Sequence, residues 1–180
     1  DDLQRTVANQ ANIFYAFEDL ERAMTLIKES ERICRQLGDL RGVSINLGNQ
    51  AGIWHARRDF ERAISSLKQQ AQICRQLGEI ELLATSLGNQ AVILLELGEV
   101  DEAMVLLKEQ EGICKKLGDV QGLAFSLANR AQALNRARRA REALPLAEEA
   151  HRLAASHGYA ALARQFEPML NAVRQSAQGQ

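Results

Sequence analysis

The sequence of 180 residues has few aromatic side chains, few prolines and almost no net charge. Aromatic residues make up 4% of the chain and proline occurs twice, whereas β-sheets are enriched in aromatic and β-branched side chains. The formal net charge is −1, so the chain lacks the excess of lysine and arginine with which proteins bind nucleic acid or anionic membranes. We therefore expect an all-α protein that binds neither nucleic acid nor a membrane.

Two kinds of hydrophobic segment are also missing. No stretch approaches the roughly twenty apolar residues that span a bilayer as a helix. The N-terminus lacks the basic stretch and the apolar run of a secretory signal peptide. These absences predict a cytoplasmic protein.

What the sequence has is a repeat of forty residues. Each copy carries a run of asparagine, a polar residue and alanine, then a second alanine, a cysteine and a glycine, and the last copy lacks the cysteine. These landmarks are Asn9, Asn49, Asn89 and Asn129; Ala23, Ala63, Ala103 and Ala143; Cys34, Cys74 and Cys114; and Gly38, Gly78, Gly118 and Gly158. A fixed period of this length predicts an array in which each unit buries its apolar face only against its neighbours.

Each repeat has the pattern of two helices joined by short turns. Apolar residues recur at spacings of three, four and seven between Ala23 and Leu37, which is the period of an amphipathic helix. Asp19 and Asp39 precede two such segments and can accept hydrogen bonds from free backbone N–H groups, while Gly38 can end the first helix in a left-handed conformation. Each unit is therefore expected to be an antiparallel hairpin of a helix A and a helix B.

The repeats divide the chain into stacked units of one continuous α-solenoid. The fourth unit is the least regular, since Pro145 lies near the start of its helix B and alanine replaces its cysteine. Solenoids need an atypical end that covers the last apolar face. We expect one solenoid over residues 1–175, with units at about 1–40, 41–80, 81–120 and 121–159, a capping helix at 160–175 and a tail at 176–180.

The hairpins resemble tetratricopeptide repeats of the longer bacterial type. The matching residues are Leu47, Ala51, Trp54, Ala63 and Leu67 in the second unit and Leu87, Ala91, Leu94, Gly98, Ala103 and Leu107 in the third. The shorter form of the repeat places proline after helix B, where this chain has Arg35, Arg75 and Lys115. The resemblance covers essentially the whole chain and implies a right-handed superhelix whose concave groove, lined by helices A, holds a peptide or a partner's helix.

The groove side of helix A follows from residue spacing. Residues three and four apart share one side of a helix, so residues between the packed positions face the groove if Leu47, Ala51 and Trp54 point into the packing. We expect Gly48, Gly52 and Gly88 to leave room there for a peptide backbone. The candidate partner-binding residues are Arg5, Asn9, Asn12, Tyr15, Asn49, Gly52, His55, Asn89, Val92, Glu96, Asn129, Gln132 and Arg136.

Four asparagines repeat along this side and have two interpretations. An asparagine amide both donates and accepts, so a row of them suits the backbone of an extended peptide. Alternatively, the amides bond to the adjacent helix or to water and only fix the register of the repeats. The carboxylate clamp of the family adds lysines one residue earlier, where this chain has Ala8, Gly48, Gly88 and Ala128, so that mode of binding is not expected.

Residues with catalytic or metal-binding chemistry are few. The cysteines lie at one phase of successive repeats, about 10 Å apart at usual helix packing distances, which is too far for a disulfide. Buried free thiols are the favoured interpretation over a metal site. The histidines stand in no metal-binding motif, and no phosphate-binding or nucleophile motif occurs. We expect no catalytic residues, no metal and no cofactor.

Arginines gather in the fourth unit, where they have two interpretations. They are Arg130, Arg136, Arg138, Arg139, Arg141 and Arg152. Guanidinium groups pair well with carboxylates, so this end is a candidate to receive an acidic segment. The alternative is a solvated surface balanced by Glu142, Glu148 and Glu149.

The sequence thus predicts a non-catalytic module for protein–protein interaction. The resemblance implies that such an array serves as a sensor or scaffold arm of a larger bacterial protein. The alternative is a structural spacer, or an engineered or duplicated array, with no ligand of its own. We expect mostly monomers, with weak end-to-end dimers through an open apolar face at Leu3, Val7 and Phe14.

Overall fold

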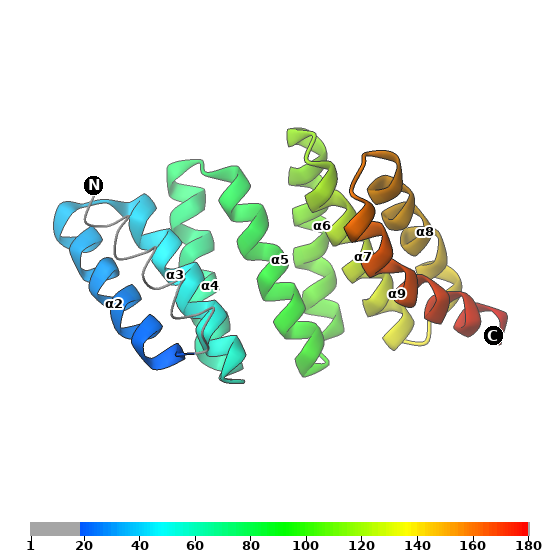
Figure 1. The fold of residues 1–180 in the computed structure, drawn as a ribbon, viewed down its shortest axis with the longest axis horizontal. Helices are drawn as coiled ribbons and strands as arrows, with labels where there is room; N and C mark the ends of the chain where they lie inside the picture. Colours follow the sequence, from blue (N-terminus) through cyan, green and yellow to red (C-terminus); the bar gives the residue numbers. More distant parts are fainter. Residues whose placement is uncertain (1–18, 180) are drawn as a thin grey trace. The chain divides into compact units, whose positions relative to one another are not determined.

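The computed structural model describes residues 19–179, and these residues are almost entirely helical (Figure 1). Consecutive helices are joined by short turns, and no strand occurs in this part of the chain. The helices are α2 (Leu20–Leu37), α3 (Leu40–Ala56), α4 (Phe60–Leu77), α5 (Ile80–Leu97), α6 (Val100–Leu117), α7 (Val120–Arg136), α8 (Ala140–Ser156) and α9 (Ala160–Gln178). The all-α prediction is confirmed.

The chain forms two compact units, Asp1–Ser86 and Leu87–Gln180, whose boundary falls inside α5. In the first unit, α3 packs against α2 on one side and α4 on the other. In the second unit, α6, α7, α8 and α9 pack in succession, and α9 also contacts α7. Neighbouring helices run in opposite directions in each unit (Figure 1). The predicted antiparallel hairpins are therefore present, with α3, α5 and α7 as helices A and α4, α6 and α8 as helices B, and α2 is the helix B that precedes α3.

The helix ends follow the local signals in the sequence. The carboxylate of Asp19 accepts a hydrogen bond from the backbone N–H of Arg22 at 3.2 Å, and Asp39 accepts one from Gly42 at 2.9 Å. Both bonds satisfy a backbone donor that the first helical turn leaves free. Gly38 ends α2 with a φ of 70°, which glycine adopts without steric cost. These caps are as predicted.

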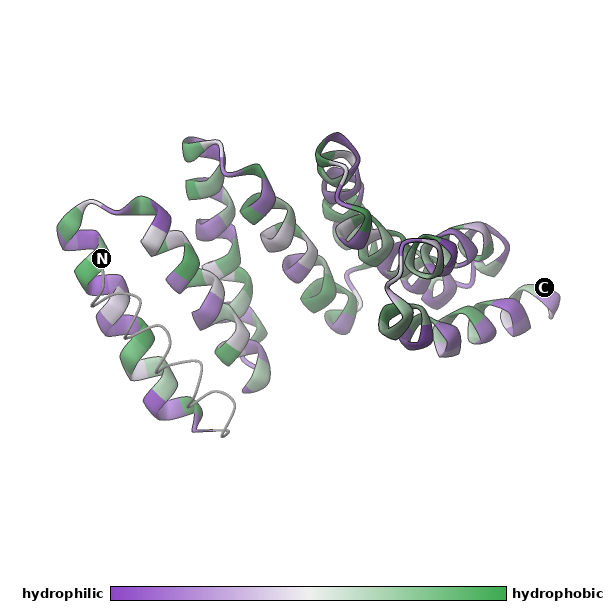
Figure 2. Ribbon diagram, turned by 45° about the horizontal axis from the view of Figure 1, so that its top comes forward, coloured by the Kyte–Doolittle hydropathy of each residue, from purple (hydrophilic) through white to green (hydrophobic). Residues whose placement is uncertain are grey.

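The core consists of small and aliphatic side chains on one stripe of each helix, so apolar and polar residues alternate around the ribbons (Figure 2). The repeated alanines of helix B, Ala23, Ala63, Ala103 and Ala143, are all fully buried. A methyl side chain there lets neighbouring helices approach closely. All three cysteines are buried free thiols, as predicted.

Helix α9 covers the end of the second unit. Leu162, Phe166, Leu170 and Val173 are buried along one side, and the Phe166 ring meets Phe125 of α7 edge to face, with ring centroids 5.6 Å apart. The sequence predicted a helix over 160–175, and α9 continues to Gln178. The last three residues of α9 therefore lie in the segment expected to be a tail.

Helix α5 is more apolar than the sequence analysis recognised. Among the described residues, it is the one helix long and apolar enough to cross a membrane by length and composition alone. More than half of its Ile80–Leu97 window (56%) is buried inside the protein, as in a core helix. Its apolar character is therefore explained by packing between helices.

Candidate functional site

The candidate residues on helices A lie on α3, α5 and α7. In the first unit, Asn49, Gly52 and His55 are half-buried on α3. In the second unit, Asn89 and Glu96 are exposed and Val92 is half-buried on α5, while Asn129 and Gln132 are half-buried and Arg136 is exposed on α7. We call the three residues of the first unit and the six residues of the second unit the helix-A face of each unit. Arg5, Asn9, Asn12 and Tyr15 lie outside the described residues.

The side-chain amides of the helix-A asparagines form no hydrogen bond with the described residues. Within residues 19–179, no hydrogen bond from another side chain or from the backbone reaches the amides of Asn49, Asn89 or Asn129. Their partial exposure lets solvent or a ligand reach them. No hydrogen bond to an adjacent helix supports the register interpretation in this part of the structure. Water or a ligand is therefore the partner that these amides can bond.

The glycines do not all have the role expected from sequence. A Cβ added at Gly48 would lie 2.6 Å from Nε2 of Gln70 on α4, and one at Gly88 would lie 2.5 Å from Nε2 of Gln110 on α6. These two glycines make room for a glutamine of helix B, so the expectation that they leave space for a ligand backbone was wrong. A Cβ added at Gly52 would meet nothing within 4 Å, so this glycine does leave open space.

The glutamines beside these glycines are buried polar groups that the sequence analysis missed. Gln70 is 3% exposed and Gln110 is 7% exposed, and Oε1 of each has no hydrogen-bond partner in the described structure. In the fourth unit, the same two positions hold Ala128 and Ala150, both buried. Glycine thus occurs opposite glutamine, and alanine opposite alanine. This pairing between repeat positions is the signal that could have revealed the contact.

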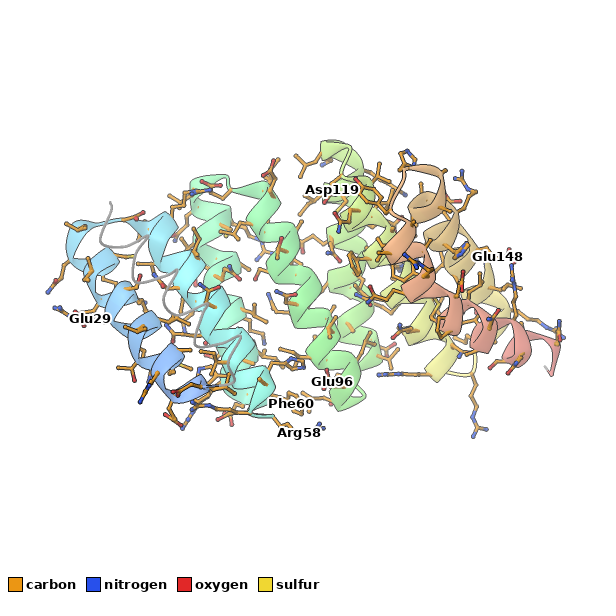
Figure 3. All side chains as sticks on the ribbon, viewed as in Figure 1. Glu29, Arg58, Phe60, Glu96, Asp119 and Glu148 are labelled. Atoms are coloured by element: carbon orange, nitrogen blue, oxygen red, sulfur yellow. The ribbon has the colours of Figure 1, made fainter. Side chains whose placement is uncertain are left out.

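His55 lies at the end of α3 where the chain turns into α4. Its ring contacts Phe60, with centroids 5.8 Å apart, and the guanidinium of Arg58 lies 5.4 Å from the Phe60 ring centroid. Figure 3 shows Arg58 and Phe60 together at this turn. Trp54, one residue earlier, has the guanidinium of Arg62 at 4.8 Å from its ring centroid. Both aromatic residues therefore have arginine beside them, an arrangement of favourable cation–π geometry.

Arg136 already has a partner inside the second unit. Its Nη1 donates to the backbone carbonyl oxygen of Leu95 at 2.6 Å, in the last turn of α5, where this carbonyl also accepts from the backbone N–H of Gly98 at 3.3 Å. The neighbouring Asn135 has a buried Oδ1 with no hydrogen-bond partner in the described chain. Arg136 therefore joins the ends of two helices A, in addition to any contact with a partner.

Ion pairs and amide contacts between helix B and the next helix A were not predicted. Gln50 of α3 donates to the carboxylate of Glu31 on α2 at 2.5 Å, and Arg130 of α7 pairs with Glu111 on α6 at the same two repeat positions. Burial alone would raise the pKa of Glu111, but the hydrogen bond from Lys115 and the charges of Arg130 and Lys115 lower this pKa below its ordinary value. Glu111 is therefore a charged structural residue.

Three of the six arginines of the fourth unit, Arg130, Arg139 and Arg152, pair with carboxylates nearby. Arg139 bonds Glu142, and Arg152 bonds Glu149, each through two hydrogen bonds of 2.6–2.8 Å. These bonds lower the pKa of Glu142 and of Glu149. The contacts support the balanced, solvated surface as the interpretation of this cluster.

Groups suited to catalysis or metal binding do not gather in the described part of the chain. No group of three or more histidine, cysteine, aspartate or glutamate side chains could hold a metal ion there. Burial, together with the nearby carboxylate of Asp119, raises the pKa of the Cys114 thiol to about 11. This thiol is therefore protonated near neutral pH and is a poor nucleophile.

Solved structures with the same fold include proteins of different kinds. BtubC from P. vanneervenii is 19% identical to this chain with a TM-score of 0.79, and the match covers 86% of this chain and 64% of that one. A signal transduction ATPase with numerous domains from Pyrococcus horikoshii, which has a tetratricopeptide repeat sensor, is 17% identical with a TM-score of 0.80, covering 96% and 26%. Aspartyl phosphate phosphatase F from Bacillus subtilis is 12% identical with a TM-score of 0.88, covering 99% and 49%.

The fold is that of tetratricopeptide-repeat proteins, an α-solenoid of stacked helical hairpins, as the sequence predicted. The chain spans less than two thirds of the length of each of these three structures. The sequence matches no protein-family model and no curated protein.

Proposed function

We propose that the chain is a non-catalytic protein-interaction module in which the helix-A face of each unit binds an extended segment of a partner protein. The observation that carries this proposal is the repeated asparagine. Asn49, Asn89 and Asn129 occupy one position of three helices A, are at least partly exposed, and have amides that no described group of the protein uses. Each amide can donate to a backbone carbonyl of the segment and accept from a backbone N–H.

The partner's backbone, more than its side chains, is the group that these amides recognise. An asparagine at every repeat offers the same donor and acceptor each time, whereas another position of the face differs between helices: it holds Gly52 on α3, Val92 on α5 and Gln132 on α7. The uniform residues provide affinity for an extended chain, and the variable ones provide preference for its side chains.

The comparison with the Pyrococcus horikoshii ATPase supports a place in a larger protein. That protein carries tetratricopeptide repeats as a sensor, and the present chain matches only 26% of its length. We infer that the present chain is likewise a sensor or scaffold arm, whose binding event is passed to another part of its protein. A chain that binds nothing would instead fit the role of a spacer.

Replacing Asn49 and Asn89 together with alanine should weaken binding by at least about 5- to 150-fold, because the loss of one hydrogen bond at each position costs about 0.5–1.5 kcal/mol. A displayed library of random linear peptides would supply the probe. The selected peptide, labelled with fluorescein, is then titrated by anisotropy against each variant, and circular dichroism verifies that helix content is kept.

The matched control is a pair of exposed residues on helices B, Lys68→Ala with Lys108→Ala. These changes should leave the affinity within about twofold. If the lysine pair abolishes binding and the asparagine pair does not, the partner uses the helix-B surface and the proposal fails. A library that yields no binder above background also counts against it.

Gly52→Ala should make the protein more stable and the same peptide bind less well. Nothing lies within 4 Å of the added methyl group, and alanine in a helix interior is about 0.5–1 kcal/mol more favourable than glycine. The methyl group would occupy open space on the helix-A face that the segment needs. Urea unfolding measures the first effect and the anisotropy titration the second.

Gly48→Ala is the control for this change, because its methyl group would push the Gln70 amide aside. We expect it to gain less stability than Gly52→Ala and to leave peptide affinity nearly unchanged. Equal binding by wild type and Gly52→Ala would show that the segment does not pass over Gly52.

A further inference from the structure

The first unit has an exposed apolar strip at the turns that lead from helix B to the next helix A. Leu37 and Leu40 flank the turn between α2 and α3, and Leu77 and Ile80 flank the turn between α4 and α5. These side chains are 67%, 44%, 42% and 47% exposed, in that order. We call these four residues the turn ridge. Single exposed leucines are common on proteins, whereas exposed apolar side chains grouped at equivalent positions are candidates for a contact surface.

The equivalent positions at the later turns do not expose aliphatic side chains to the same extent. At the next turn, Leu117 is half-buried, and Val120 packs against the core of the second unit. At the turn after that, the equivalent positions are His157 and Ala160. Helix formation alone would be served equally well by polar residues at all these turns. Exposed aliphatic side chains at two successive turns therefore call for an explanation other than folding.

The charges beside the turn ridge are balanced within the chain. Nε of Arg41 lies 2.9 Å from the carboxylate of Glu79, and this ion pair joins the two turns. Arg35 pairs with Glu31 at 2.6 Å, and the carboxylate of Asp39 caps α3. A strongly acidic or strongly basic partner gains no net attraction from such a surface. A partner that itself presents one positive and one negative charge beside an apolar strip fits it better.

We propose that the turn ridge is the contact surface between two copies of this chain, related by a two-fold axis. In an isologous contact, if residue i of one copy meets residue j of the other, then residue j of the first copy meets residue i of the second. Leu37 and Leu40 then pack on the second copy's Leu77 and Ile80, and Arg41 faces the second copy's Glu79. The ion pair beside the ridge is thus complementary to itself across the axis.

The size of the ridge sets the strength of this dimer. Stable interfaces bury about 800 Å² on each partner, and four partly exposed aliphatic side chains supply only part of that area. The dimer is therefore weak and reversible, and it forms at high concentration or when the chain is held near a second copy. No residue of the helix-A face belongs to the ridge.

Sedimentation equilibrium over a micromolar to millimolar concentration series tests the dimer. The disrupting variant is Leu40→Glu with Ile80→Glu, since each residue opens a helix and glutamate in a first helical turn is favourable for the fold. This variant should raise the dimer dissociation constant at least about tenfold. Val105→Glu is the matched control, because Val105 is 65% exposed on α6 and lies outside the ridge. It should leave the constant unchanged.

The opposite results would overturn the proposal. They are a wild-type chain that stays monomeric over the whole series, a dimer that resists the two glutamates, or a dimer that Val105→Glu disrupts equally. A dimer lost on Val7→Glu and kept in the ridge variant would instead support association through the N-terminal end. Circular dichroism of each variant verifies that it is folded.

The orientation of the two copies has a separate test, a disulfide between introduced cysteines, which is possible because the native thiols are buried. Leu37→Cys and Leu77→Cys each place one exposed thiol on the ridge, while Cys34, Cys74 and Cys114 are buried. In an oxidised equimolar mixture, the disulfide between the two different variants should form faster than either self-linked dimer, because Leu37 of one copy meets Leu77 of the other. Statistical pairing of the three products would rule out this arrangement.

Discussion

Leu107→Ala is expected to lower the free energy of unfolding by about 2–5 kcal/mol. Leu107 is fully buried on α6, and its backbone carbonyl accepts a hydrogen bond of 2.8 Å from the hydroxyl of Ser126 on α7. The substitution removes apolar surface from the core and leaves a cavity beside a carbonyl that fixes the next helix. In a repeat array each hairpin rests only on its neighbours, so no distant contact compensates for the loss.

Urea unfolding followed by circular dichroism measures this effect, and Val105→Ala on the same helix is its control. Val105 is 65% exposed, so its truncation should change the free energy of unfolding by no more than about 0.5 kcal/mol. Equal midpoints for the Leu107 and Val105 variants would mean that Leu107 does not face the core, contrary to the structure.

The features that the sequence predicted correctly depend on local physics. The ends of α2 and α3 follow from Asp19, Gly38 and Asp39, because caps act on backbone groups within a few residues. The repeated period identified the helical hairpins because each landmark recurs on the same side of the same helix. The buried thiols followed from that phase as well.

The contacts that the sequence did not reveal depend on which helix faces a given residue. Gly48 was assigned to the groove by spacing alone, yet its open side faces Gln70 of α4. Spacing places a residue on one side of its own helix, but the neighbouring helix determines what that side meets. The bond between Gln50 and Glu31 was missed for the same reason, since its two residues lie on different helices.

The candidate site was predicted in part for a related reason. Positions such as Asn49 and Asn89 could be placed on helix A from the repeat. Only the structure shows that no residue between 19 and 179 bonds their amides. Arg136 shows the limit of the pattern, because it occupies the expected side of α7 and nevertheless bonds the end of α5. Side chains long enough to reach a second helix are the ones that a single-helix argument places least well.

Ala91→Leu should destabilise the protein by about 1–3 kcal/mol through overpacking. Ala91 is fully buried on α5, and the equivalent Ala51 and Ala131 are 2% and 0% exposed, so this position is closed in each described repeat that has it. A leucine there must push a neighbouring helix away or adopt a strained rotamer, because close-packed interiors leave no space for it.

The control for this change is Ala172→Leu, at an exposed position of α9 where a larger side chain extends into solvent. Urea midpoints with unchanged slopes should fall for Ala91→Leu and stay nearly constant for Ala172→Leu, since an unchanged slope shows that the same surface is exposed on unfolding. If the two variants unfold at the same midpoint, Ala91 faces solvent. The assignment of Asn89 to the ligand side of α5 would then fail too, because the two residues are fixed relative to each other by the turn of one helix.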